Sequence, residues 1–372
     1  MKYGFFAFIL AFFLSMMAYI LVRGGQASNY LSPTWKNIYI ISSIVLFLLF
    51  FVGMIFGNYF PLTIAKTITF LGDSFLLVLV YLTLSFLATD ILLLINKLFP
   101  LIKTDIISFR FWAMMISVFV IFVAMIMGNY KFNHPNIVHL KIETEKAKKN
   151  KSIKIVALSD VHLGISIDKK RLKKYVEMIN EQQPDLVLIA GDLIDRSIQP
   201  VVKQKMEEEL LQIKAPMGIY AIFGNHEHFG EGTDIIANFY EKAGIKLLID
   251  SVVLVQNQFY IAGRDDKTNY HRKNLGEILQ NIDKSQPIIL LDHQPSDLKA
   301  AEENKVDLQI SGHTHNGQFF PGNLIVKQMF ELGYGYLKKG KTNYYVSSGL
   351  GLWGPQYRIG SQSELVVINF NY

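Results

Sequence analysis

Apolar residues gather in the first third of the chain, in four long runs that contain almost no charged side chain. The runs extend over residues 3–22, 38–57, 74–95 and 109–128. Each is close to the roughly 20 residues that a helix needs to cross the hydrocarbon core of a bilayer. Helices buried in a soluble domain would show polar faces at helical spacing, and these runs have almost none. The pattern therefore predicts a transmembrane region of four helices over residues 1–130.

The first run follows a lysine and has the apolar character of a secretory signal. It is long for a signal, it lacks a convincing small-residue cleavage site, and three further runs follow it, so we interpret it as an anchor. Aromatic rings, which are typical of the headgroup level, lie near the ends of the runs. They are Tyr19, Tyr30, Trp35, Tyr39, Tyr59 and Trp112. These features predict a multi-pass protein of the cell membrane.

Four crossings put both ends of the helical region on one side of the membrane. Cytoplasmic loops carry an excess of Lys and Arg, so the charges on the two sides can be compared. The side of the N-terminus has Lys2, Lys66, Lys131, Lys141, Lys146, Lys148 and Lys149, against Arg23, Lys36, Lys97, Lys103 and Arg110 on the other side. The comparison favours a cytoplasmic C-terminal domain by a small margin.

Asp90 is the one carboxylate inside the four runs. An ionisable residue at membrane depth is a functional candidate. Asp90 also lies only about a turn and a half from the end of its run, where its carboxylate can reach the interface. The neighbouring sequence supplies no obvious partner, so we interpret Asp90 as an interfacial residue.

The composition changes directly after the fourth run. An Asn-His-Pro sequence ends the helical pattern, residues 137–142 alternate like an edge strand, and residues 145–151 form a lysine-rich polar turn. These lysines can contact anionic headgroups or simply solvent. We expect a linker with an edge strand over residues 131–152 and a separate domain over residues 153–372.

Short apolar runs alternate with amphipathic segments from residue 153 onward. A strand at 153–158, a helix around residues 172–179 and a second strand at 185–190 form a β-α-β unit. Further strands are expected at 219–223, 246–249, 252–255, 259–262, 287–291, 308–310, 344–346 and 365–370, and further helices at 234–242, 272–282 and 296–304. Because strands outnumber helices, the pattern predicts an α/β domain with two packed sheets between helical layers.

Residues that can bind metal ions directly follow five of the predicted strands. The five motifs are Asp160-Val161-His162, Gly191-Asp192, Gly224-Asn225-His226-Glu227, Asp292-His293 and Gly312-His313-Thr314-His315. The chain has no cysteine, so a metal ion must be held by imidazole, amide and carboxylate groups. One such motif alone is more often a loop histidine or a capping aspartate, but five at strand ends predict a metal site.

These motifs, in this order, resemble those of the calcineurin-like metallophosphoesterases, and the resemblance extends from about residue 153 to the C-terminus. Residues 312–318 and 346–355, with Arg358, are similar to the bacterial membrane-associated phosphodiesterase branch, which resembles enzymes acting on phospholipids and on the lipid A precursor UDP-2,3-diacylglucosamine. The resemblance implies a four-layer α/β/β/α sandwich, preceded here by four transmembrane helices. Asn316 stands where that branch commonly has Gly, and four spans replace a single anchor. Both departures concern substrate and topology.

The resemblance also implies roles for individual residues. The first metal ion would be held by Asp160, His162, Asp192 and His315. The second would be held by Asp192, Asn225, His293 and His313, with Asp192 as the bridge. Two divalent cations about 3.5 to 4 Å apart lower the pKa of a shared water, so that a hydroxide can attack phosphorus in line. Family habit favours Mn, and Fe, Zn or Ni suit the same ligands.

His226 is the expected catalytic residue. It cannot easily join the metal ligands if its neighbour Asn225 is one of them, so the resemblance and the geometry both favour a role as proton donor or charge stabiliser at the leaving oxygen. Asp160 is expected to help orient it. Further polar residues near strand ends are interpreted as exposed charges or local salt bridges, although Arg358 has the geometry to grip a phosphate. They are Arg264, Asp265, Asp266, His271 and Arg358.

We therefore expect a membrane-anchored dinuclear-metal phosphohydrolase, a phosphodiesterase or pyrophosphatase, acting on a lipid-linked or phospholipid-type substrate. The alternative is a membrane sensor or scaffold with a catalytically degenerate domain, which the complete ligand set disfavours. A channel or transporter is disfavoured because the spans contain so few polar residues. Nucleic acid is not an expected partner despite the net charge of +6, because the basic residues are scattered. Oligomeric state is left open.

Overall fold

The computed structural model describes residues 2–146 and 151–372, and the chain divides into two compact units. The first unit comprises Met1–Met127 with Gly354–Gln356, and the second comprises Gly128–Trp353 with Tyr357–Tyr372. Lys148 and Lys149 of the predicted lysine-rich turn lie outside the described residues.

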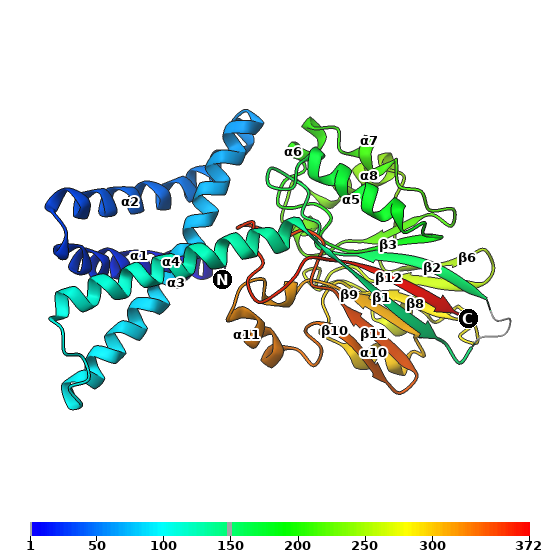
Figure 1. The fold of residues 1–372 in the computed structure, drawn as a ribbon. Coiled ribbons are helices and arrows are strands. Elements are labelled where there is room, and N and C mark those ends of the chain that lie inside the picture. Colours follow the sequence, from blue (N-terminus) through cyan, green and yellow to red (C-terminus); the bar gives the residue numbers. More distant parts are fainter. Residues whose placement is uncertain (1, 147–150) are drawn as a thin grey trace. The chain divides into compact units, whose positions relative to one another are not determined.

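The first unit consists of long apolar helices (Figure 1). These are α1 (Lys2–Ala27), α2 (Pro33–Phe56), α3 (Leu62–Leu98) and α4 (Ile106–Asn133), the last of which continues into the second unit. Each contains a stretch long and apolar enough to cross a membrane, as predicted. Gly72 of α3 lies against the backbone of α2 at Phe50, where a larger side chain would overlap it. Such close approach at a small residue is typical of helix packing in membranes.

Asp90 on α3 has partners on two other helices. Its carboxylate accepts a hydrogen bond from the Tyr19 hydroxyl at 2.8 Å and pairs with Arg23 Nε on α1 at 2.7 Å. Arg110 Nη1 on α4 lies 3.2 Å from the other carboxylate oxygen. The prediction that Asp90 has no obvious partner is therefore wrong, because all three partners are distant in sequence and meet it only when the helices pack. The cluster joins α1, α3 and α4.

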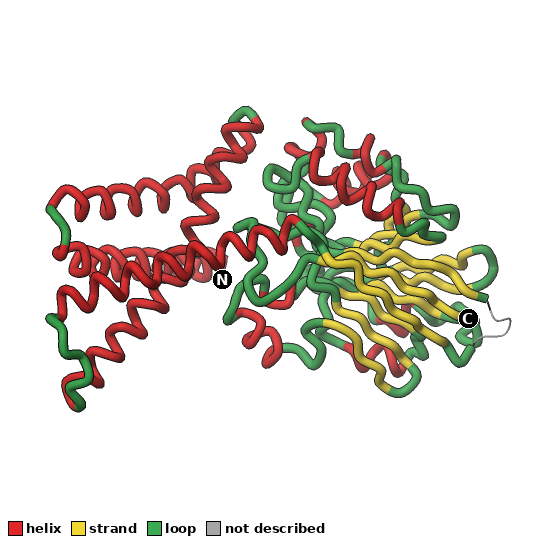
Figure 2. Tube along the Cα trace, viewed as in Figure 1, coloured by secondary structure: helices red, strands yellow, loops and turns green. Residues whose placement is uncertain are grey.

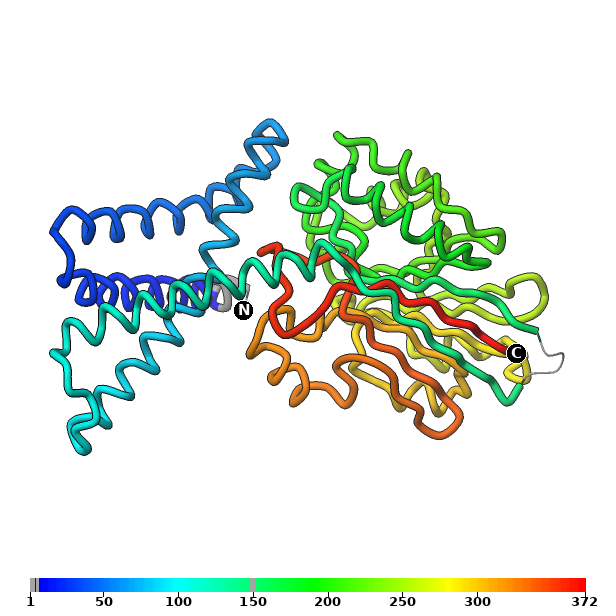
Figure 3. Tube along the Cα trace, in the orientation of Figure 1, coloured from blue at the N-terminus to red at the C-terminus, as the bar shows by residue number. Residues whose placement is uncertain are grey.

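The second unit contains two sheets, whose strands are yellow in Figure 2, and each sheet has both parallel and antiparallel pairs. One sheet has the order β1 (Asn136–Glu143), β12 (Glu364–Asn371), β2 (Ser152–Leu158), β3 (Leu186–Ala190), β4 (Ile219–Ile222) and β5 (Lys246–Leu247). The other has the order β10 (Gly335–Lys339), β11 (Thr342–Val346), β9 (Leu308–Ser311), β8 (Ile288–Leu291), β7 (Phe259–Gly263) and β6 (Ser251–Val255). As predicted, β1 is an edge strand. The C-terminal strand β12 pairs parallel with β1 and antiparallel with β2 (Figure 3).

Helices cover the outer face of each sheet, which confirms the predicted four-layer α/β/β/α arrangement. The β1 sheet carries α5 (Lys169–Glu181), α6 (Gln199–Lys203), α7 (Glu207–Leu210) and α8 (Thr233–Lys242), and the β10 sheet carries α9 (Leu275–Ile278) and α10 (Leu298–Glu303). Alternation along β3 shows the layering: Val187 and Ile189 pack under α5, whereas Leu186 and Leu188 pack between the sheets. Burial on both faces explains why these strands read as continuous apolar runs.

Several elements differ from the prediction. The helix expected at 272–282 is only the short α9, which begins at an Asn274–Glu277 capping box and ends at Ile278. Strand β10 was not predicted, because its lysines and glycine mask the strand pattern. Helices α6 and α7 and the eight-residue α11 (Gly322–Met329) were not predicted either, since each is too short to show helical periodicity.

Candidate metal centre

The predicted metal-binding residues all lie at the carboxyl ends of strands. Strands β2, β3 and β4 are parallel neighbours in one sheet, and β8 and β9 are parallel neighbours in the other. Carboxyl ends of parallel strands meet at one edge, which is where α/β sheets bind ligands. The structure brings all seven predicted ligand residues and His226 together at this edge.

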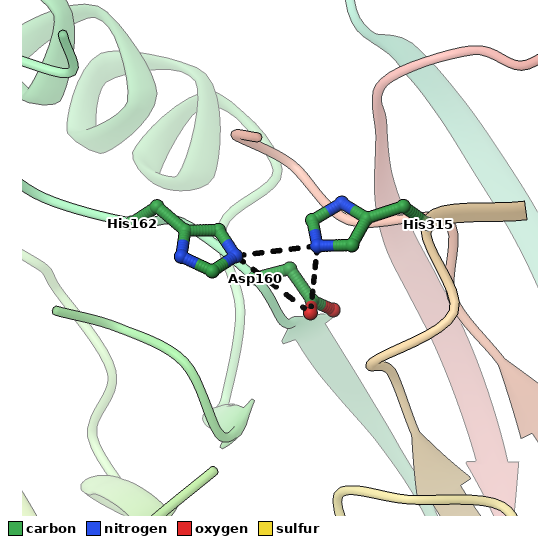
Figure 4. Close-up of side chains that lie close together, drawn as sticks. All are labelled: Asp160, His162 and His315. Carbon is green, nitrogen blue, oxygen red and sulfur yellow. Dashed lines mark hydrogen bonds and ion pairs between the residues drawn. The ribbon is translucent and has the colours of Figure 1, made fainter. Parts of the chain in front are cut away.

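Three side chains of the predicted first site converge from β2 and β9 (Figure 4). The Nε2 atoms of His162 and His315 are 3.2 Å apart, and His315 Nε2 lies 3.3 Å from Asp160 Oδ1. His162 Nε2 lies 4.0 Å from the same oxygen. All three side chains are buried. Two ring nitrogens and a carboxylate oxygen that face one another form a donor set suited to a divalent cation.

The predicted second site lies beside the first. Asn225 Oδ1 is 2.8 Å from His313 Nδ1 and 3.2 Å from His293 Nε2. His293 Nε2 is also 3.2 Å from Asp192 Oδ2. The other ring nitrogen of His293 lies 2.7 Å from the carbonyl oxygen of Ala190, which fixes the ring so that Nε2 faces the cluster.

Asp192 lies between the two groups. Its Oδ2 atom is 3.2 Å from His293 Nε2 in one group and 3.8 Å from His162 Nε2 in the other. Its Oδ1 atom accepts a hydrogen bond from the backbone N–H of His226 at 2.9 Å, which holds the carboxylate in this orientation. The position suits a carboxylate shared by two cations.

Unusual backbone conformations aim these side chains at one another. Five of the seven predicted ligand residues have positive φ angles between 50° and 70°, which non-glycine residues rarely adopt. They are Asp160, His162, Asp192, His313 and His315. Such strain clusters at functional sites, where the surrounding structure must hold it. Gly224 and Gly312 contribute by close approach, because a Cβ atom at either would overlap the carboxylate of Asp192 or Asp160.

His226 borders both groups but is oriented by a residue that was not predicted. Its Nδ1 atom lies 3.0 Å from Asp195 Oδ1, and its ring contacts the His162 ring edge to face. The expectation that Asp160 orients His226 is therefore wrong. Asp195 follows Asp192 by three residues in the loop after β3, and a carboxylate at that spacing was the signal available in the sequence.

Burial and neighbouring charges set the protonation of this cluster. Burial raises the pKa of Asp192, but the charges of His293 and His162 outweigh it and lower the net value. Burial together with the charge of His162 lowers the pKa of His315, so its imidazole stays neutral, the form that binds metal. For His226, burial opposes protonation, yet Asp195 and Asp192 raise the pKa above its ordinary value.

Glu227 stabilises the two loops that carry Asp192 and Asn225. It is fully buried, and its carboxylate accepts hydrogen bonds from the backbone N–H groups of Gly224, Asp192 and Ile194 at 2.8 to 3.1 Å. The hydroxyl of Tyr240 donates to it as well. Glu227 thereby ties the loop after β4 to the loop after β3, which carry Asn225 and Asp192.

Arg358 is neither an exposed charge nor available to a phosphate. Its side chain is fully buried and donates to the carbonyl oxygens of His315, Gly349 and Gly351 and to the hydroxyl of Ser363. The interpretations of Arg358 as an exposed charge or salt bridge and as a phosphate-binding residue are therefore wrong. Its hydrogen bond to the carbonyl of His315 instead holds the backbone of that residue in place.

Arg264 and Asp265 form local salt bridges, as predicted. Arg264 pairs with Asp292 at 2.9 Å, and Asp265 pairs with His228 at 2.9 Å. Asp266 accepts hydrogen bonds from the Gln294 amide. Arg264, Asp265 and Asp266 are buried rather than exposed, and Arg264 and Asp266 contact Asp292 and Gln294, the two sequence neighbours of His293.

The donor set fits a pair of divalent metal ions. The facing atoms are imidazole nitrogens and carboxylate or amide oxygens, without a thiolate. In two buried groups, Asp160–His162–His315 and Asp160–Asp192–His293, the donor atoms lie within 4.8 Å of one another, and the half-buried Asp195 and His226 form a third such group with His162. Borderline and hard divalent cations prefer such ligands.

Comparisons with known proteins agree with this geometry. Residues 153–317 match the model of the calcineurin-like phosphoesterase family. The chain is 32% identical to an uncharacterized metallophosphoesterase of Aquifex aeolicus over 260 residues, which cover 66% of this chain and 97% of the relative. A Campylobacter jejuni relative, also an uncharacterized metallophosphoesterase, is 32% identical over 70% of this chain and 69% of its own length. The chain belongs to the calcineurin-like metallophosphoesterases.

A relative with membrane segments is also similar. The chain is 32% identical to a Danio rerio transmembrane protein with metallophosphoesterase domain, over 63% of this chain and 57% of that protein. Together with the four apolar helices, this similarity supports membrane localisation.

Proposed function

We propose that this protein is a membrane-anchored, two-metal phosphoester hydrolase, a phosphodiesterase or pyrophosphatase. The observation that carries the proposal is the convergence of seven imidazole, carboxylate and amide groups at one sheet edge, with His226 beside them. Membership of the metallophosphoesterase family supports the same reaction class.

In this proposal the seven residues hold two divalent cations. Asp160, His162, Asp192 and His315 bind one, and Asp192, Asn225, His293 and His313 bind the other. When bound, such cations supply an activated water near neutral pH and neutralise charge on the phosphoryl oxygens. Mn²⁺ is the proposed ion, and Fe, Zn or Ni suit the same atoms.

His226 acts on the leaving group. Its raised pKa favours the protonated imidazole, and Asp195 holds Nδ1 so that Nε2 remains free to donate to an oxygen. A proton delivered there, or a positive charge held there, stabilises the alkoxide or phosphate as the P–O bond breaks. His226 is thus the proposed catalytic residue and Asp195 its positioning residue.

The substrate is proposed to be lipid-linked or phospholipid-like. Residues 1–130 form the membrane region in this proposal, residues 131–152 the linker with an edge strand, and residues 153–372 the catalytic domain, facing the cytoplasm. Four apolar helices fix the enzyme at a bilayer, where a lipid-borne phosphoester is concentrated and a soluble one is not.

Turnover of bis-p-nitrophenyl phosphate by the purified full chain tests the reaction class. We expect hydrolysis that depends on added Mn²⁺ and is abolished by a chelator. A protein that binds Mn²⁺ but hydrolyses neither this diester nor a pyrophosphate would instead be a binding module with a degenerate site, and the proposal would fail.

Lipid extracts test the substrate class. Extracts incubated with the protein and Mn²⁺ should lose a phosphoester lipid and gain its hydrolysis products, identified by mass spectrometry. The matched control is the His226→Ala variant in the same extract. Hydrolysis of water-soluble phosphoesters alone would contradict the lipid-linked substrate.

A further inference from the structure

Helix α11 presents an apolar stripe to solvent. Phe320, Leu324, Ile325 and Met329 are 51% to 70% exposed, and no residue of the helix is buried. Leu324, Ile325 and Met329 share one face by helical spacing, whereas Val326 lies on the other side against Gly333. A contiguous exposed apolar stripe of this kind marks an interaction surface.

Both ends of α11 are attached to the candidate metal centre. Before the helix, the 3₁₀ turn His315–Gly317 contains a predicted ligand, and the backbone N–H of Gln318 donates to the carbonyl of His315 at 3.0 Å. After the helix, the ring of Phe330 lies with its centroid 6.5 Å from that of His313. Whatever α11 binds is therefore held beside the metal centre.

The segment before α11 is also connected to the end of the fourth apolar run. That run ends at Gly128, whose carbonyl accepts a hydrogen bond from the backbone N–H of Arg358 at 2.9 Å. The next residue, Ile359, accepts a hydrogen bond from Phe320 N–H at 2.6 Å and donates to Gln318 at 3.1 Å. All these residues belong to the second unit.

The chain itself brings this domain to a bilayer, because it carries four helices long and apolar enough to cross a membrane. Within the second unit, backbone hydrogen bonds through Arg358 and Ile359 join Gly128, the last residue of the fourth apolar run, to Phe320 at the start of the apolar stripe. A lipid surface is therefore the occupant that the rest of this chain provides for the stripe.

Two further side chains match a lipid surface. Trp353 is 45% exposed, and its carbonyl accepts a hydrogen bond from the Gln318 amide at 3.0 Å, two residues before Phe320. Tryptophan is typical of headgroup depth in membranes. Lys327 is exposed on α11 and provides a positive charge for anionic headgroups.

We propose that α11, together with Phe320 and Trp353, docks on the lipid bilayer and holds the metal centre at headgroup level. The apolar stripe enters the boundary between headgroups and acyl chains, as in other interfacial helices. The phosphate of a bilayer lipid then lies at the depth of the site, so lipids that remain in the membrane during hydrolysis are the substrate class. The docking stands on its own, and the substrate class rests on the proposed function.

Fluorescence quenching tests the docking without any assay of activity. Because the chain has no cysteine, a single cysteine in Ile325→Cys can carry an environment-sensitive fluorophore. Leu211→Cys is the matched control, since Leu211 is 58% exposed and follows α7 in the outer helical layer. The full chain is placed in vesicles of phosphatidylcholine and phosphatidylglycerol with brominated acyl chains.

We expect quenching at position 325 to exceed quenching at position 211 by at least about twofold, because only the first label enters the acyl boundary. Equal quenching at the two positions would overturn the proposal. Protection of position 325 from both brominated lipid and aqueous iodide would show that a second copy of the chain or another protein covers the stripe, and it would overturn the proposal as well.

A pair of surface variants tests the substrate class. In L324S/I325S/M329S we expect turnover of a phosphodiester lipid in vesicles to fall about tenfold or more, while turnover of bis-p-nitrophenyl phosphate is unchanged. The control V202S/L211S replaces equally exposed apolar residues of the outer helical layer and should alter neither rate. Undiminished vesicle turnover in the first variant would refute the inference. Absence of turnover of both substrates in the unmodified protein would refute the proposed function and leave the quenching result standing.

Discussion

Asp192 and His226 show how single residues define the chemistry at this sheet edge. Asp192 faces imidazoles from both groups, and its backbone hydrogen bond comes from His226 itself. The Nδ1 atom of His226 lies 3.0 Å from Asp195, a residue outside the predicted ligand set. Asp192 is thus placed to bind metal ions, whereas His226 is placed to transfer a proton.

Replacing His226 with Ala should lower turnover about a hundredfold or more, which is a typical contribution of a positioned acid or base. The metal content should not change, because His226 lies outside the predicted ligand set. Asp195→Asn should lower turnover less and shift its pH profile, since the imidazole then loses the partner that raises its pKa. Steady-state kinetics with elemental analysis of the same samples checks this. Loss of metal from the His226 variant would show that the residue is a ligand instead.

Sequence reasoning performs well at this scale where a residue is part of a contiguous motif. The five motifs contain the seven predicted ligand residues and His226, which the structure brings together, because each motif directly follows a buried strand. Asp195 and Arg358 were misjudged for a different reason. The partner of Asp195 lies in the loop after β4, and the carbonyl of His315, which accepts from Arg358, lies 43 residues away, so the sequence alone does not show that these groups meet.

Ion pairs between different elements stabilise this protein in addition to apolar burial. In the first unit, Asp90 connects α1, α3 and α4 through Arg23 and Arg110. In the second, His228 in the turn after β4 pairs with Asp265, two residues beyond β7. The second pair joins the two sheets next to the metal centre.

Asp90→Asn should destabilise the helical unit by about 1 to 3 kcal/mol. The variant leaves two arginines without a counter-ion, and the estimate is reduced from that for a fully buried pair because the side chains are 19% to 29% exposed. Thermal unfolding in detergent measures the change. The double variant Arg23→Gln/Asp90→Asn should be less destabilised than the sum of the single variants. Strict additivity would show that the pair is not coupled.

The His228–Asp265 pair should contribute stability that depends on pH. The hydrogen bond to Asp265 raises the pKa of His228, so the folded state favours the protonated ring. The contribution is fully present below the ordinary pKa of about 6.5 and disappears as pH rises through the higher folded value. His228→Gln should therefore lower the melting temperature more at pH 6 than at pH 9. A melting-temperature difference that is the same at both pH values would contradict this assignment.

Prediction at the scale of elements succeeds where burial dictates the sequence. The fully buried strands β2, β3, β8 and β9 were predicted because two packed faces demand continuous apolar runs. Strand β10 and helix α11 are exposed and carry no such signal. The exposed face of α11 became visible only once its neighbours in space were known.

The whole molecule combines four apolar helices with a metallophosphoesterase domain. Helix α4 is shared by the two units, because its last residues, from Gly128 onward, belong to the second unit. Phe132 in this part of α4 is fully buried in the core of the second unit. The Gln362 amide donates to the carbonyls of Lys131 and His134 and fixes the end of α4. The end of the fourth apolar helix is thus part of the folded metallophosphoesterase domain.

The central claim is that the seven predicted ligand residues hold a dinuclear metal site and that this site hydrolyses phosphoesters. It is tested most directly by adding Mn²⁺ stepwise to the chelator-treated full chain and measuring bis-p-nitrophenyl phosphate hydrolysis against bound metal. The account predicts that activity rises until two ions are bound per chain, and that Asp192→Asn, which removes the bridging charge, binds fewer ions and stays inactive. Activity that is complete without bound metal, or an Asp192→Asn variant that keeps two ions and full turnover, would contradict it.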